Sequence, residues 1–222
     1  MIHCIGDSHT TLFMKPGDVN PRLWSEYEAD FLTRKQDVYE QFAAYPIGPA
    51  TAYGLWKRVG TINTILGRFY NKSDYVMLVV GEIDCRAHVV KQSMIQSKPI
   101  ESVSFAVADK LFEFLLSLRE EGIEPIAWNA LYSYRSSFGC VLDHNPEFLA
   151  VGTPLQRGLA VDAYNQRLSE RCKQHGIPFI GIWKNCDLDY RDAVHLSSKM
   201  LPLVVLEFQK CGLLQYESES SR

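Results

Sequence analysis

The sequence lacks several features that would place it in a specialised class. No apolar run approaches the roughly 20 residues of a membrane-spanning helix, and no cluster of lysine and arginine marks a nucleic-acid-binding face. The start of the chain does not show the positive region and long apolar stretch of a signal peptide. No internal repeat or linker-like segment is visible. We therefore expect a cytoplasmic protein that binds neither nucleic acid nor a membrane.

Cysteines are few and scattered. The six of them form no C-x-x-C pair and have no zinc-type spacing. We expect them to be reduced and mostly buried. Apolar residues make up 46% and charged residues 22%, which is typical of a globular domain. The length of 222 residues fits one domain, for which we expect the bounds 1–215, followed by a polar tail at 216–222.

Short apolar runs alternate with longer amphipathic segments. The run 75–80 is apolar throughout and bounded by turn residues, which is typical of a strand buried on both faces. Further strands are predicted at 2–5, 41–47, 125–128 and 179–182, and helices at 51–70, 100–121, 157–175 and 197–210. A long loop is predicted at 129–153. This alternation predicts a three-layer α/β domain with a mostly parallel sheet.

Polar residues follow several of these strands, at the edge where such sheets bind ligands. Ser8 comes directly after a buried strand and a turn, but serine is a weak nucleophile unless a base takes its proton. Asp192 and His195 offer a carboxylate and an imidazole three residues apart. A carboxylate of this kind can orient the imidazole while the other ring nitrogen faces a serine.

These blocks resemble those of the SGNH hydrolases, also called GDSL esterases and lipases. Gly6-Asp7-Ser8 is similar to the nucleophile block and Asp192-x-x-His195 to the final block, while Gly48 matches the glycine block. The resemblance implies a flavodoxin-like α/β/α fold and ester hydrolysis without a cofactor or metal. It also implies that Ser8 attacks, His195 moves the proton and Asp192 orients His195, while the backbone N–H groups of Ser8 and Gly48 hold the oxyanion.

The third block departs from the family pattern. Gly81-x-x-Asp84 matches it in part, but Ile83 stands where the family has an asparagine that donates to the oxyanion. Losing one such donor typically costs about 10²–10³ in rate. The run 81–86, Gly-Glu-Ile-Asp-Cys-Arg, resembles a sub-branch found alongside bacterial glycan and capsule enzymes, which suggests an O-acylated carbohydrate or another small ester as substrate.

Three further residues are predicted to bind substrate: Asp84, Arg86 and Asn165. Arg86 can clamp a carboxylate or phosphate, or instead form an internal ion pair with Asp84. Asn165 and Arg157 can face the site, or lie on a solvated helix face. His88 competes with His195 as the base.

Other functions remain open at this point. The same triad would serve an O-acetyltransferase acting on a glycan. A relative that binds sugars without turnover would keep the fold and lose the oxyanion site at Ile83. Asp, Glu and His side chains near the strand ends would suit a metal-dependent phosphoesterase. Ser8 alone would also suit a helix cap. The sequence does not define the oligomeric state.

Overall fold

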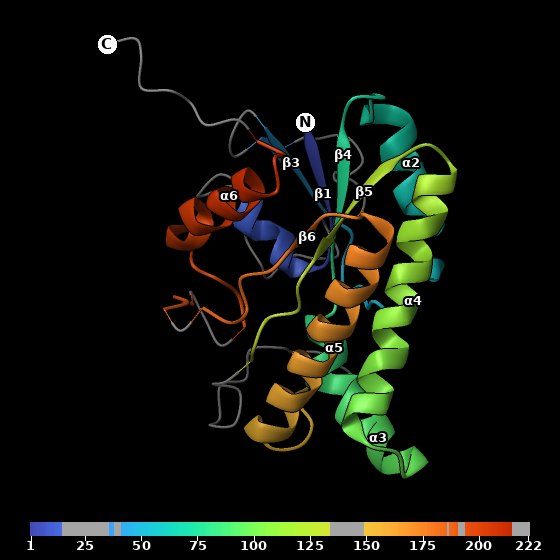
Figure 1. Cartoon of the computed structure of the whole chain (residues 1–222), viewed down its shortest axis with the longest axis vertical. Helices are drawn as coiled ribbons and strands as arrows, with labels where there is room; N and C mark the ends of the chain where they lie inside the picture. The colour runs from blue at the N-terminus through green and yellow to red at the C-terminus, as the bar shows by residue number, and fades with distance from the viewer. Residues whose placement is uncertain (15–35, 38–40, 134–148, 186, 191–193, 215–222) are drawn as a thin grey trace.

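The computed structural model describes residues 1–14, 36–37, 41–133, 149–185, 187–190 and 194–214. Its centre is a six-stranded sheet (Figure 1). From edge to edge the strands are β2 (Gln36–Asp37), β3 (Phe42–Pro46), β1 (Ile2–Gly6), β4 (Tyr75–Val79), β5 (Glu124–Trp128) and β6 (Phe179–Ile180). All neighbouring pairs are parallel except β2 and β3. The prediction of an α/β domain with a mostly parallel sheet is confirmed.

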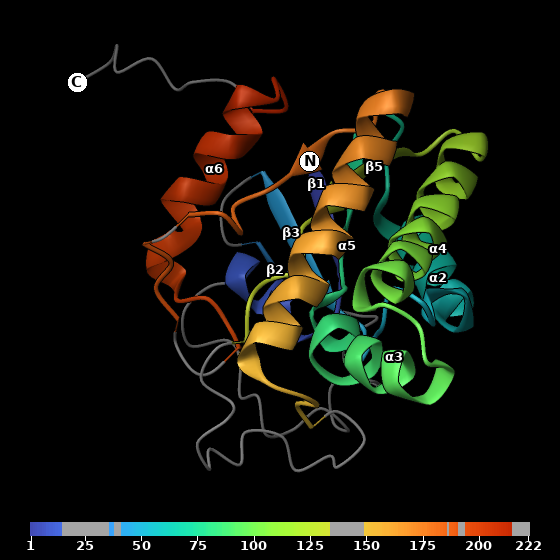
Figure 2. The same cartoon turned by 60° about the horizontal axis from the view of Figure 1, so that its bottom comes forward.

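Helices cover both faces of this sheet. One face carries α2 (Val59–Phe69), α4 (Ile100–Glu120) and α5 (Pro154–His175), and the other carries the 3-10 helix η1 (Ser8–Phe13) and α6 (Leu201–Lys210). Figure 2 shows α6 on one side of the strands and α4 and α2 on the other. Four shorter helices complete the described chain: η3 (Leu55–Arg58), η4 (Asp84–Val89), α3 (Val90–Gln96) and η7 (Ser198–Met200).

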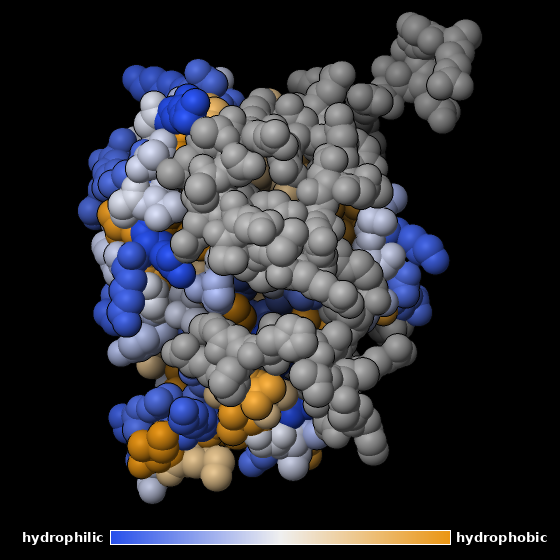
Figure 3. Space-filling model, turned by 180° about the vertical axis from the view of Figure 1, so that it is seen from behind, coloured by the Kyte–Doolittle hydropathy of each residue, from blue (hydrophilic) through white to orange (hydrophobic). Residues whose placement is uncertain are grey.

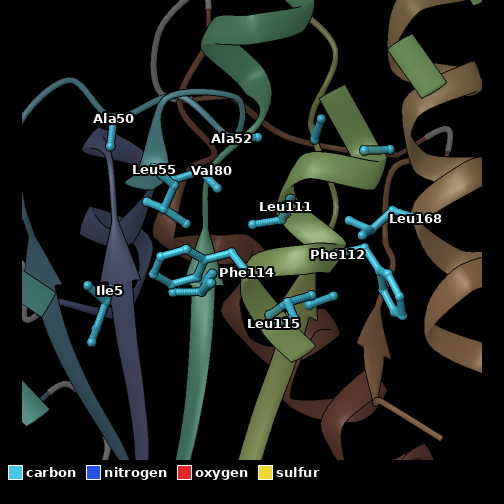
Figure 4. Packing of buried hydrophobic residues seen from close by; sticks show 14 of the residues in the cluster. Ile5, Ala50, Ala52, Leu55, Val80, Leu111, Phe112, Phe114, Leu115 and Leu168 are labelled. Carbon is cyan, nitrogen blue, oxygen red and sulfur yellow. The ribbon is translucent and has the colours of Figure 1, made fainter. Parts of the chain in front are cut away.

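The central strands β3, β1, β4 and β5 are almost wholly buried, and alternate residues serve different cores. In β4, Val76 and Leu78 pack toward α4 and α5, whereas Met77 and Val79 pack toward η1 and α6. Figure 4 shows the first of these cores, in which Leu55 and Val80 lie near Leu111 on α4. Because each face is covered, β4 is apolar without interruption, which is the pattern that predicted it.

Several element boundaries differ from those predicted. Helix α5 begins at Pro154 rather than 157, after a capping box in which Thr153 accepts from Gln156. It ends at His175, and Gly176 follows with a φ of 63°, in the left-handed conformation that closes the helix. The helical segment formed by η4 and α3 was not predicted. Most of the predicted loop, at 134–148, and the polar tail lie outside the described residues.

The described surface is mixed in character. The face shown in Figure 3 combines hydrophilic residues with smaller hydrophobic areas. Within the described ranges, no helix is long and apolar enough to cross a membrane. Cys4, Cys85 and Cys172 are buried free thiols and Cys211 is exposed, whereas Cys140 and Cys186 lie outside the described residues.

Candidate active site

Ser8 and His195 meet at the carboxyl edge of the sheet. Ser8 is the first residue of η1, directly beyond β1, and His195 lies in the segment between β6 and η7. His195 Nε2 lies 2.7 Å from Ser8 Oγ, although 187 positions separate the two residues in the chain. This is the contact that a histidine base needs in order to take the proton of a serine nucleophile. Asp192, the predicted orienting acid, lies outside the described residues.

The turn that carries Ser8 is fixed by short backbone contacts. The Asp7 N–H donates to the Val79 carbonyl at 3.0 Å, and the Thr10 hydroxyl donates to the Asp7 carbonyl at 2.8 Å. Gly6 is required here, because a Cβ at this position would lie 1.9 Å from the Val79 carbonyl oxygen. These contacts hold Ser8 at the end of the strand while its side chain stays partly accessible.

Gly48 lies on the neighbouring strand end. Gly6 pairs in register with Pro46, and the Ile47 N–H donates to the Gly6 carbonyl at 2.7 Å. Gly48 has a φ of 80°, a conformation that favours glycine. Its buried N–H donates to no other backbone group among the described residues. The first N–H of a helix, here that of Ser8, also has no partner within the helix. Ser8 and Gly48 both lie just beyond the ends of the paired strands β1 and β3.

His9 is a second histidine at this edge, and both of its ring nitrogens face acceptors. Nδ1 lies 2.9 Å from Asp7 Oδ1, and Nε2 lies 3.1 Å from the Val194 carbonyl oxygen. Burial alone would lower the pKa of His9, but the Asp7 carboxylate, with help from Glu82 and the Val194 carbonyl, raises it to about 9. No motif in the sequence pointed to a partner for His9.

Asp84 is buried, and its carboxylate binds backbone groups of the protein itself. Its carboxylate accepts hydrogen bonds from the Ala52 N–H at 2.6 Å and the Tyr53 N–H at 3.2 Å, which ties η4 to the loop that follows β3. Burial raises the pKa of Asp84 to about 7, against the opposing effect of these two donors. With 1% of its surface exposed, Asp84 offers no surface to a substrate, so we do not retain it as a binding residue.

Arg86 forms an internal ion pair, but the partner shown is Glu82 rather than Asp84. Arg86 Nε lies 2.8 Å from Glu82 Oε1, and both side chains are buried. Ile83, at the position of the family's asparagine, is also buried, and its side chain has no donor. Ile83 therefore cannot supply the side-chain donor of the family pattern, and the oxyanion role of the Ser8 and Gly48 N–H groups stays a prediction.

Asn165 and Arg157 do not lie on a solvated helix face, which corrects that interpretation. Asn165 is fully buried, and its amide bonds both backbone groups of Ala130, accepting from the N–H at 2.7 Å and donating to the carbonyl at 2.8 Å. Arg157 is 3% exposed and donates to the Gly152 carbonyl at 2.6 Å. Asn129 accepts from the Ile182 N–H and donates to the Ala130 carbonyl. Asn165 thus fixes the chain after β5 and is not retained as a substrate contact.

Two further features bear on the alternative base, His88, and on the alternative of a metal-dependent phosphoesterase. The histidine bonded to Ser8 is His195, whereas His88 lies within η4. Among the residues that the structure describes, no group of three His, Cys, Asp or Glu side chains is arranged to hold a metal ion.

A small depression beside His195 is packed too closely to hold a water molecule. Its lining is largely apolar and consists of His9, Thr11, Leu12, Trp128, Leu131, His195 and Leu196.

Comparison with known proteins places the fold. No family model and no curated protein sequence matches this chain. Solved structures do match. An acetylxylan esterase from Geobacillus stearothermophilus aligns with a TM-score of 0.54 and 14% identity, over 98% of this chain and 96% of the other. The acetyl xylan esterase AlAXEase aligns with a TM-score of 0.53 and 15% identity, over 95% of this chain and 98% of the other. A putative acylhydrolase from Bacteroides fragilis aligns with a TM-score of 0.51 and 16% identity, over 95% of this chain and 86% of the other.

These matches extend over nearly the whole chain, so the protein has the α/β fold found in these esterases and in the acylhydrolase. At this level of identity the likeness concerns the fold alone. The sub-branch suggested by the run 81–86 stays a prediction.

Proposed function

We propose that this protein is a serine-dependent ester hydrolase in which Ser8 is the nucleophile and His195 the general base. The observation that carries the proposal is the 2.7 Å contact between Ser8 Oγ and His195 Nε2 at the carboxyl edge of the sheet. The shared fold with esterases supports it, because ligands of open parallel sheets bind at this edge. Asp192 belongs to the proposal as the acid that orients His195.

The reaction follows from this geometry in two stages. Ser8 Oγ attacks the ester carbonyl carbon while its proton passes to His195 Nε2, and the carbonyl oxygen becomes an oxyanion held by the Ser8 and Gly48 N–H groups. When the intermediate collapses, the alkoxide leaves with the proton from His195, and the acyl group stays on Ser8. A water molecule then attacks the acyl carbon and gives its proton to His195. Collapse releases the carboxylic acid and restores the Ser8 hydroxyl.

The proposed substrate is an ester with a short acyl group, such as an O-acetylated carbohydrate. The carbohydrate part rests on the resemblance of the run 81–86 and on the fold neighbours, two of which are acetylxylan esterases.

Turnover of model esters tests this proposal. We expect wild-type protein to hydrolyse p-nitrophenyl acetate faster than p-nitrophenyl octanoate, and to release acetate from acetylated xylan. Ser8→Ala and His195→Ala should lose at least about 10³ in kcat, as triad members do. Ser104→Ala is a matched control, because Ser104 is a buried serine on α4 whose hydroxyl bonds the Ile100 carbonyl. Equal activity in wild type and Ser8→Ala would overturn the assignment.

A further inference from the structure

The His9 side chain joins the two segments that carry the catalytic pair. Ser8 and His9 are neighbours in the chain, and so are Val194 and His195. The two pairs are linked crosswise: His195 Nε2 contacts Ser8 Oγ at 2.7 Å, and His9 Nε2 contacts the Val194 carbonyl at 3.1 Å. The two peptide bonds and the two hydrogen bonds therefore form a closed ring, of which the Ser8 hydroxyl is a member.

The imidazole rings of His9 and His195 also pack against each other. Their centroids lie 4.9 Å apart, with the planes tilted by 37°. A shift of the His9 side chain would move the carbonyl that precedes His195 and also remove a surface against which the His195 ring rests.

His9 is itself held firmly in this position. Asp7 Oδ1 accepts from both the His9 backbone N–H at 2.8 Å and the ring Nδ1 at 2.9 Å. Asp7 is fully buried and anchored to β4 through the Val79 carbonyl. His9 cannot act on Ser8 directly in this arrangement, because each of its ring nitrogens is directed at another acceptor.

We propose that His9 is a positioning residue that holds the Val194–His195 segment against the turn after β1, so that His195 Nε2 reaches the Ser8 hydroxyl. This role rests on the proposed hydrolase function. The protonated form of His9 suits it, since only an imidazolium donates from both nitrogens and thus binds Asp7 and Val194 together. The titratable groups that face His9 are Asp7 on its own turn, Glu82 beyond β4 with its partner Arg86, and His195.

The test uses two variants of His9 and a matched control. His9→Leu removes both donors, whereas His9→Gln keeps an N–H donor within reach of the Val194 carbonyl. The control is His3→Leu: His3 is also a buried histidine of the same strand region, bonded to Asp74 at 3.1 Å and Tyr45 at 3.2 Å, but at the opposite end of β1. For each folded protein, one measures kcat and KM for p-nitrophenyl acetate and the rate at which a fluorophosphonate labels Ser8.

We expect His9→Leu to lower kcat and the labelling rate by about 10- to 100-fold with little change in KM, since a small displacement of a catalytic group costs about 10² in rate. His9→Gln should recover most of that loss, and His3→Leu should keep the wild-type rates per folded molecule. Wild-type rates in folded His9→Leu would overturn the positioning role, and so would equal losses in all three variants. If wild type and Ser8→Ala were equally inactive, the proposed hydrolase function would fail instead.

Discussion

Replacing Asn165 with leucine tests whether this residue supports the structure or touches the substrate. The substitution keeps the side-chain size but leaves the buried Ala130 N–H without the acceptor that lies 2.7 Å away. An unsatisfied buried donor costs about 1–3 kcal/mol. The Ala130 carbonyl still accepts from the Asn129 amide at 3.2 Å, so losing its hydrogen bond from Asn165 costs less, about 1 kcal/mol. We expect a total destabilisation of about 2–4 kcal/mol.

The assay is urea unfolding followed by tryptophan fluorescence, with KM for p-nitrophenyl acetate measured in parallel. For a domain of this size, such a loss lowers Tm by roughly 10 °C. Asn63→Leu serves as a control, because Asn63 is exposed on α2 and its replacement should change stability by no more than about 0.5 kcal/mol. Unchanged stability of Asn165→Leu together with a raised KM would refute the reasoning and restore the substrate contact.

Two pH-dependent predictions concern buried groups at the same edge. The pKa of His9 rises from its ordinary 6.5 to about 9. The stability gained from its imidazolium is therefore full below pH 6.5 and is lost as the pH rises through 9. In urea unfolding, the free energy of unfolding of wild type should fall by about 3 kcal/mol over that window relative to His9→Gln. Parallel curves for the two proteins would argue against the buried imidazolium. The pKa of Asp84 rises from 3.8 to about 7, so its protonated form stabilises the fold below pH 3.8, and this advantage is lost as the pH rises through 7. Wild type should therefore lose about 4 kcal/mol between pH 4 and pH 8 relative to Asp84→Asn, whereas a constant difference measured by thermal or urea unfolding would contradict the assignment.

The architecture was predictable because burial on both faces leaves a plain trace in the sequence. The run 75–80 is apolar throughout, the other parallel strands are mostly apolar, and glycines follow the ends of α4 and α5. The start of α5 is also marked in the sequence, because Thr153 and Gln156 form a capping box and Pro154 stands in the first turn.

The helical segment 84–96 was harder to predict. Its first residues are Asp84, Arg86 and His88, whose polar character suggested a ligand site rather than a helix. Ile83 precedes it without a side-chain cap, so no start signal of the usual kind is present. The geometry of η4 is also that of a π-helix, for which the sequence pattern of an ordinary helix is a poor guide.

Within the candidate site, the residues that sequence reasoning found are those that belong to short motifs, above all Ser8 and His195. The roles of His9 and Asn165 depend on partners 185 and 35 positions away in the chain. A single sequence contains no trace of such contacts, because they arise only when the sheet brings distant strand ends to one edge. A polar residue on a helix is therefore predicted to face solvent, even when its side chain forms hydrogen bonds with a buried backbone group.

The central claim is that Ser8 is a nucleophile activated by His195. Reaction of the folded protein with a fluorophosphonate, followed by intact mass measurement and peptide mapping, tests it most directly. The account predicts one phosphonyl group per chain, located on Ser8, with labelling abolished in Ser8→Ala and strongly slowed in His195→Ala. A folded wild-type protein that takes up no label, or that carries it on a residue other than Ser8, would contradict the account.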